Sequence, residues 1–226
     1  MEVIFMNQTE NAASTGGVTA AKRLRLRLGK DFFSAKNIAV YGVLLAVSIV
    51  LQIFGGSIQI GVASLNFTLV PLVLAALLYG AWGGAFIGAV NGVIVFLTAC
   101  VFAPSGLFVA MFALNPFAMF LICFLKTTVA GFLSGLFFDL VAGKNKRAAV
   151  FVASGVAPIV NTGIFVLGML CLYNDIAQII GDSAQVIYTI FVGCVSFNFF
   201  IELAINLLVA PALYVVYRAV EKQFVR

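Results

Sequence analysis

The segment Phe117–Val141, FAMFLICFLKTTVAGFLSGLFFDLV, decides the fold class of this chain. It is almost entirely apolar and is long enough to cross the hydrocarbon core of a membrane as one helix. Its one basic residue, Lys126, lies about a third of the way along it. A lysine near the middle of a membrane helix costs about 2.5 to 3.5 kcal/mol on insertion scales. Two explanations are open: an ion pair with another helix, or a cation that faces a water-accessible cavity and receives an anionic ligand.

The composition of the whole chain also indicates a membrane protein. Of its 226 residues, 63% are apolar and 9% are charged, and the mean hydropathy is +1.16. Soluble proteins, in contrast, are about a quarter charged. The sequence therefore predicts an all-α polytopic membrane protein in two parts. A cytoplasmic N-terminal arm, disordered and then basic, occupies residues 1–36, and the membrane domain occupies residues 37–226.

The residue types that are missing exclude several function classes. Histidine is absent, which removes the commonest general base and most zinc sites. The four cysteines occur singly and without CxxC spacing, as small core residues do. The chain has no P-loop motif for ATP. We therefore expect no metal, no cofactor and no catalytic activity in this chain.

Glycine, proline and charged residues divide the apolar sequence into six predicted helices. Their approximate bounds are 38–54, 66–79, 85–102, 117–141, 148–173 and 186–217, with a short interfacial helix at 107–114. Six spans place the basic N-terminal arm, the loop with Lys144, Lys146 and Arg147, and the basic C-terminal tail on one side. The positive-inside rule makes that side cytoplasmic, so both termini are predicted to face the cytoplasm across the plasma membrane.

Three helices carry small residues at helical spacing. These residues are Ala39, Gly42 and Ala46 on the first helix, Gly84, Gly88 and Gly92 on the third, and Gly131 and Gly135 on the fourth. Such rows let helix backbones approach closely in a membrane. On the third and fourth helices they predict packing within the chain. On the first helix, a face for a partner subunit is an equally good interpretation.

Polar residues inside the spans predict a cavity. Lys126, Asn161, Asn198 and Asn91 come at similar depths when each is counted from the outer end of its own helix. On the sixth helix, Glu202 and Asn206 continue the face of Asn198 at intervals of four residues. The predicted substrate-binding residues are Lys126, Asn161, Thr162, Asn198, Glu202 and Asn91. The alternative is that Lys126 pairs with Glu202 while the amides hold helices together.

Several motifs in this order carry a resemblance to a known family: Pro71–Gly80, Trp82–Ala85 with Gly88, Asn161–Phe165, and Asn198 to Asn206 with Ala210–Pro211. They resemble the substrate-binding membrane subunits, or S components, of energy-coupling factor (ECF) vitamin transporters. The resemblance spans nearly all of the chain after the N-terminal arm. It implies six helices, one vitamin or precursor bound near the outer face by helices four to six and the outer loops, and no ATPase in the chain itself.

The resemblance also implies partners. S components dock on a transmembrane coupling protein that holds two ATPase subunits, and they reorient in the membrane to release the substrate inside. In that family a small-residue motif on the first helix meets the coupling protein. Gly42 and Ala46 match this motif, with glycine in place of the usual alanine, and Ala39 on the same face is included in the predicted partner-binding surface.

The chemistry of the polar cluster narrows the ligand. A cationic Lys126 among Asn161, Asn198 and Asn91 suits a small carboxylate that bears hydroxyl or amide groups, and pantothenate is the first choice. Riboflavin, a pyridoxine-like ring and a thiamine precursor remain open. A second function of a different class is a stand-alone proton-coupled secondary transporter, in which Lys126 and Glu202 form a proton-linked pair.

Overall fold

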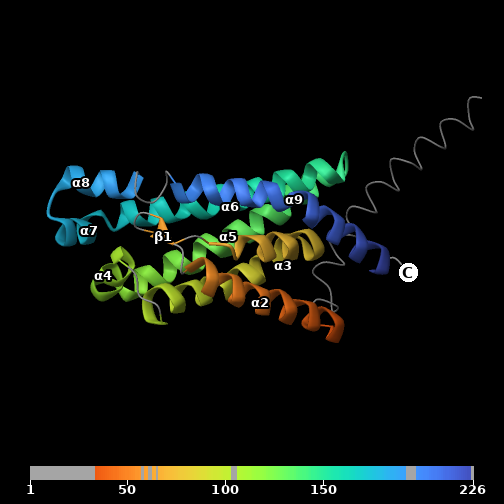
Figure 1. Cartoon of the computed structure of the whole chain (residues 1–226), viewed down its shortest axis with the longest axis horizontal. Helices are drawn as coiled ribbons and strands as arrows, with labels where there is room; N and C mark the ends of the chain where they lie inside the picture. The colour runs from red at the N-terminus through yellow and green to blue at the C-terminus, as the bar shows by residue number, and fades with distance from the viewer. Residues whose placement is uncertain are drawn as a thin grey trace, which may run out of the picture. The chain divides into compact units, whose positions relative to one another are not determined.

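The computed structural model describes residues 34–56, 59–60, 63–64, 66–102, 106–191 and 197–224. In chain order its elements, shown in Figure 1, are α2 (Ala35–Gly56), β1 (Gln59–Ile60), β2 (Ala63–Ser64), α3 (Leu69–Phe96), the π-helix η1 (Leu97–Phe102), α4 (Gly106–Leu114), α5 (Pro116–Ala142), α6 (Lys146–Cys171), α7 (Tyr173–Ile180), α8 (Ser183–Tyr188) and α9 (Phe197–Phe224). Contacts divide the chain into residues 1–40 and residues 41–226. The packing below is that of the second unit. The predicted arm before residue 34 lies outside the described residues, so its boundary with the membrane domain stays a prediction.

A single glycine turns α3 back on itself. Gly80 has φ 74° and ψ −165°, a backbone conformation that glycine adopts far more readily than other residues. As a result, Asn91 Nδ2 donates a hydrogen bond to the carbonyl oxygen of Thr68 at 3.3 Å. A straight helix would hold these two residues about 35 Å apart. The element therefore consists of two antiparallel arms, which we call the first arm (residues 69–79) and the second arm (residues 81–96).

The described residues contain five helical segments that are long and apolar enough to cross a membrane: Asn37–Gly55, Leu69–Cys100, Pro116–Ala142, Lys146–Cys171 and Asn198–Val220. The second segment folds back at Gly80, so its two arms correspond to the second and third predicted helices. The all-α membrane fold is confirmed. The fourth and fifth helices, and the short helix before them, lie within about two residues of their predicted bounds.

The first arm is too short to cross the membrane. At 1.5 Å per residue it extends about 16 Å, against about 30 Å for the hydrocarbon core. Before it, β1 and β2 form a small antiparallel hairpin, in which Gln59 pairs with Ser64 and Ile60 pairs with Ala63. The backbone at Asn66 and Phe67, just before this arm, therefore lies at membrane depth. Such non-helical backbone is tolerated only where protein surrounds it or where it lines a polar cavity.

Glycines bring α5 into backbone contact with the second arm of α3. Gly84 and Gly131 lie so close together that a methyl group on either would overlap the carbonyl oxygen of the other. One turn further along, a methyl group on Gly88 would overlap the carbonyl oxygen of Thr127. Helices in a membrane associate through such close packing because lipid supplies no hydrophobic drive between them. The predicted use of these small-residue rows for packing within the chain is confirmed.

Aromatic and glycine contacts show which helix ends meet. Phe138 on α5 packs against Tyr217 on α9, with ring centroids 5.2 Å apart. An added methyl group on Gly135, close to Phe138 on α5, would overlap the backbone at the Gly80 turn. The same end carries Lys144, Lys146, Arg147 and Arg218. This gathering of basic residues supports the predicted cytoplasmic assignment of that end.

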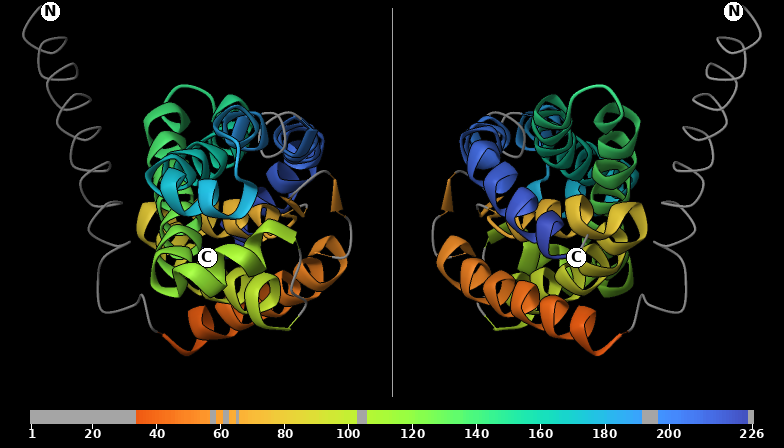
Figure 2. Two further views of the ribbon diagram at one scale, coloured as in Figure 1. Left: turned by 90° about the vertical axis from the view of Figure 1, so that its left-hand side faces the viewer. Right: turned by 90° about the vertical axis from the view of Figure 1, so that its right-hand side faces the viewer.

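Viewed end-on, α2 and α6 lie on opposite sides of α3 (Figure 2). The end of the bundle opposite the basic residues is closed by the short helices α4, α7 and α8 (Figure 1). Buried apolar side chains gather there into what we call the outer apolar cluster: Ala99, Cys100, Phe108, Met111, Met119, Ile122, Phe165, Met169, Ile176, Val186 and Ile190. The predicted start of the sixth helix at Val186 is wrong, because α9 begins at Phe197. Val186 belongs to α8 and is buried in this cluster, whereas its neighbours Ile187 and Tyr188 are exposed.

We predict that Gly131→Val destabilises the fold, because the added side chain must displace the backbone at Gly84. Overpacking a close contact typically costs about 1 to 3 kcal/mol. Thermal unfolding of the purified protein in detergent measures the effect as a lower Tm. Gly163→Val is the control, since Gly163 also lies in a long helix but has no atom within 4 Å of an added Cβ. Equal Tm values for the two variants would contradict the backbone contact.

Candidate functional site

Lys126 lies on the buried side of α5 and is only 6% exposed. The helix begins at Pro116, and the side chain of Asn115 caps it by accepting a hydrogen bond from the Ala118 N–H at 3.2 Å. Lys126 is therefore about 15 Å along the helix. Its Nζ lies 4.7 Å from the ring centroid of Phe165 on α6. Such a cation–π contact is worth about 0.5 to 2 kcal/mol. This is less than the several kcal/mol that removing the ammonium group from water costs.

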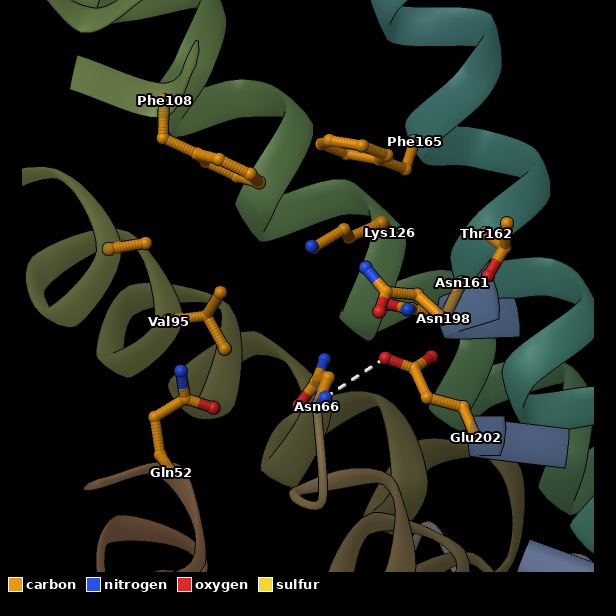
Figure 3. Close-up of a pocket in the computed structure, with 11 residues that line it drawn as sticks. Gln52, Asn66, Val95, Phe108, Lys126, Asn161, Thr162, Phe165, Asn198 and Glu202 are labelled. Atoms are coloured by element: carbon orange, nitrogen blue, oxygen red, sulfur yellow. Dashed lines mark hydrogen bonds between the residues drawn. The ribbon is translucent and has the colours of Figure 1, made fainter. Parts of the chain in front are cut away.

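A cavity of about 40 Å³ lies beside Lys126 (Figure 3). Its lining residues are Gln52, Asn66, Val95, Ala99, Phe108, Lys126, Asn161, Thr162, Phe165, Asn198 and Glu202. The volume is enough for about three water molecules. Pockets that hold drug-sized ligands have volumes of about 300 Å³ or more, so a vitamin fits here only if the surrounding side chains move apart. Ala99, Phe108 and Phe165 also belong to the outer apolar cluster, which closes the cavity on that side.

Glu202 on α9 is the carboxylate of this cavity and is 5% exposed. Its Oε1 accepts a hydrogen bond from the backbone N–H of Asn66 at 2.9 Å, drawn as the dashed line in Figure 3. Among the described residues, no carboxylate lies within the 4.0 Å that defines a salt bridge with Lys126. The structure therefore does not show the ion pair that is the alternative explanation for the buried lysine. The amine of Lys126 and the carboxyl group of Glu202 thus face one cavity without a direct contact.

The structure brings together five of the six predicted substrate-binding residues: Lys126, Asn161, Thr162, Asn198 and Glu202. Asn161 and Asn198 are each 4% exposed. The Oδ1 atom of Asn161 is buried and has no hydrogen-bond donor among the described residues. A buried amide oxygen without a donor costs about 1 to 3 kcal/mol. A ligand that donates to it would recover that free energy.

Asn91 is the predicted residue that the structure leaves out of the cavity lining. It is fully buried, and its Nδ2 donates to the Thr68 carbonyl between the two arms of α3. Counting residues from the outer end of the helix placed Asn91 at the level of the cavity, but such a count does not show which face of the helix the residue occupies. Asn206, on the predicted polar face of α9, likewise lies below the cavity and donates to the carbonyl oxygen of Glu202 at 2.8 Å.

Two cavity residues, Gln52 and Asn66, were not predicted. Asn66 lies between β2 and the first arm, where the shortness of that arm brings it to cavity depth. Its Oδ1 accepts from the Thr68 N–H at 3.3 Å, and its Nδ2 is buried without an acceptor among the described residues. Gln52 and Ser48 are the polar residues in the apolar run 42–56 of α2, and Gln52 has the only side-chain amide there. An amide within so apolar a run was the available signal.

The chemistry of the cavity suits binding. The described residues contain no group of three or more histidine, cysteine, aspartate or glutamate side chains that could hold a metal ion. What the cavity offers is one cation, one carboxylate and several amides, with aromatic rings on the outer side: Phe108 stacks on Phe165 with centroids 5.5 Å apart and an interplanar angle of 11°. A few placed polar groups within apolar walls are typical of small-molecule sites.

Comparison with known proteins agrees with this geometry. The family model described as "ECF transporter, substrate-specific component" matches residues 36–214, which is most of the chain. No curated protein sequence matches the chain. The matched region runs from the start of α2 into the second half of α9 and includes all the residues that line the cavity. The chain therefore belongs to the substrate-specific components of ECF transporters, which are non-catalytic, multi-pass subunits of the plasma membrane that work with an energising module.

Proposed function

We propose that this substrate-specific component captures a small anionic vitamin or vitamin precursor in the cavity beside Lys126 and delivers it inward with an ATP-driven coupling module. The observation that carries the proposal is the Lys126 ammonium group, which is buried, faces the cavity and has no carboxylate partner among the described residues. A charge held in a membrane bundle without a counter-ion favours a ligand that supplies one. The predicted substrate-binding residues Asn161, Thr162, Asn198 and Glu202 line the same cavity.

Pantothenate is the vitamin we propose first. Its carboxylate can accept charge-assisted hydrogen bonds from Lys126. Its hydroxyl and amide groups can donate to the Asn161 oxygen and to Glu202. The alternatives of a riboflavin, pyridoxine-like or thiamine-type ring would rely on stacking, and here Phe108 and Phe165 are already stacked on each other. Trp82 is 52% exposed and lies beside the Gly80 turn, so it does not contribute to this cavity.

We predict that Lys126→Ala abolishes pantothenate binding while leaving the protein folded, because it removes the cation but no hydrogen bond to another described residue. Isothermal titration calorimetry of the purified protein measures the loss, and size-exclusion chromatography checks the fold. Lys144→Ala is the matched control, since Lys144 is exposed at the cytoplasmic end and should bind as the unmodified chain does. Normal binding by Lys126→Ala would assign this lysine a purely structural role.

The partner face proposed on α2 fits the exposure of its small residues. Ala39, Gly42 and Ala46 are exposed, and no atom lies within 4 Å of a Cβ built on Gly42. The other side of the helix, with Tyr41, Leu44, Ser48 and Gln52, is buried. A surface of small residues lets a partner helix approach closely. We propose that the transmembrane coupling subunit, which holds the two ATPase subunits, docks there.

Gly42→Leu should prevent assembly with the coupling subunit without unfolding this chain, because the added side chain finds free space in the isolated protein but separates the two helices in the complex. Co-purification of the tagged chain with the coupling subunit measures assembly. Gly163→Leu introduces the same side chain at another open helical glycine and should assemble normally. Unimpaired assembly of Gly42→Leu would place the docking face elsewhere.

The competing function, a stand-alone proton-coupled transporter, is favoured by one observation: Glu202 is a buried carboxylate in the same cavity as Lys126. Uptake of radiolabelled pantothenate separates the two. We expect uptake to require the coupling subunit and ATP, and to be lost in cells that lack that subunit. Uptake that persists without the coupling subunit and collapses on addition of a protonophore would instead establish the secondary transporter.

A further inference from the structure

Gln52 is one of the two cavity residues that the sequence did not predict, and it lies outside the helices and loops of the site that the resemblance implies. It lies on α2 and is 3% exposed. Its Nε2 donates a hydrogen bond to Thr98 Oγ1 at 3.1 Å. Its Oε1 is buried and has no donor among the described residues. A buried polar atom of this kind requires either a functional explanation or a ligand.

The neighbouring hydrogen bonds fix which end of the amide faces the cavity. Thr98 Oγ1 lies 2.8 Å from the carbonyl oxygen of Ile94 and 3.1 Å from that of Val95, so its single hydrogen is directed to those carbonyls. Thr98 can then only accept from Gln52, and the group that reaches Thr98 must be the NH₂ group. The oxygen is left toward the cavity (Figure 3). Thr98 itself is part of the π-helix η1, a type of segment that often marks functional sites.

We propose that Gln52 is a substrate-contacting residue whose Oε1 accepts a hydrogen bond from a hydroxyl or N–H group of the ligand. The inference rests on the proposed function and narrows its substrate class. The ligand carries a donor group for Gln52 in addition to the anionic group for Lys126. A simple monocarboxylate with an apolar remainder is thereby excluded, and a hydroxylated or amide-bearing carboxylate is selected. The site then extends to α2, the helix that carries the proposed partner face.

The test compares Gln52→Leu with the unmodified chain and with Ser48→Ala. Ser48 lies one turn earlier on the buried face of α2, and its hydroxyl bonds the Leu44 carbonyl at 2.8 Å without lining the cavity. Titration of pantothenate should show about tenfold weaker affinity for Gln52→Leu, as expected when a buried donor loses its acceptor. Ser48→Ala should stay within about twofold of the unmodified chain.

Singly O-methylated pantothenates identify the contact itself. If Gln52 accepts from one of the two hydroxyls, the corresponding methyl ether should bind the unmodified chain about tenfold more weakly than pantothenate does, whereas Gln52→Leu should bind the two equally. If Gln52 accepts from the amide N–H of pantothenate instead, the N-methyl analogue should bind the unmodified chain about tenfold more weakly than pantothenate, and Gln52→Leu should bind the two equally. A purely structural role for Gln52 predicts that both proteins discriminate equally against all these analogues, and that result overturns the inference.

The melting temperature of the ligand-free protein is a readout that does not depend on the identity of the ligand. Gln52→Leu removes the unpartnered oxygen, which favours the fold, and also the NH₂ group that donates to Thr98 Oγ1, which costs the modest stability of a single hydrogen bond, so the ligand-free Tm should change little. A Tm lowered well beyond the loss of that single hydrogen bond would show that the oxygen is satisfied within the protein and would overturn the inference. Failure of the unmodified chain to bind pantothenate would instead overturn the ligand named under the proposed function.

Discussion

The backbone contact between the second arm of α3 and α5 is the constraint on which the rest of the structure depends. Gly84 and Gly131 allow an approach that no larger residue permits, and this fixes the position of α5, from which Lys126 reaches the cavity beside Phe165 of α6. The first arm, which folds back at Gly80, then stops part of the way across the bundle. The space beyond its end is filled by the β-hairpin, by Asn66 and by the cavity. Close packing in the half that carries the basic residues and polar space in the other half are thus two results of one arrangement.

The cavity is lined by several polar groups that lack a hydrogen-bond or ion-pair partner among the described residues. A cation and a carboxylate face it without pairing, and buried oxygens of Gln52 and Asn161 have no donors among the described residues. Each such group costs stability in the ligand-free protein. A ligand that meets several of them at once recovers those costs together, which gives high affinity from a small contact area. The same groups reject molecules that satisfy only some of them.

The sequence predicted correctly those features that depend on a single helix, namely its position in the chain and the depth of its polar residues. The apolar run around Lys126 predicted α5 and the depth of its lysine, and Asn161 and Thr162 followed from the same count on α6. Prediction failed where the answer depends on how helices face one another. Asn91 shares the level of the cavity but turns toward Thr68, and Gln52 reaches the cavity because α2 packs with that side inward. The start of α9 was misplaced because the apolar residues from Val186 onward were counted as part of it, although Val186 belongs to the separate short helix α8.

The short first arm has a consequence for how the protein is made. An arm of about 16 Å cannot remain in a bilayer as an independent spanning helix, so it has to enter the membrane together with the second arm as a hairpin. The chain just before it, at Asn66, is tied by a backbone hydrogen bond to Glu202, a residue 136 positions later in the chain. That bond forms only after α9 has been synthesised. The substrate cavity is therefore completed at the end of biogenesis, and a truncated chain that lacks α9 would keep the glycine-packed half but no binding site.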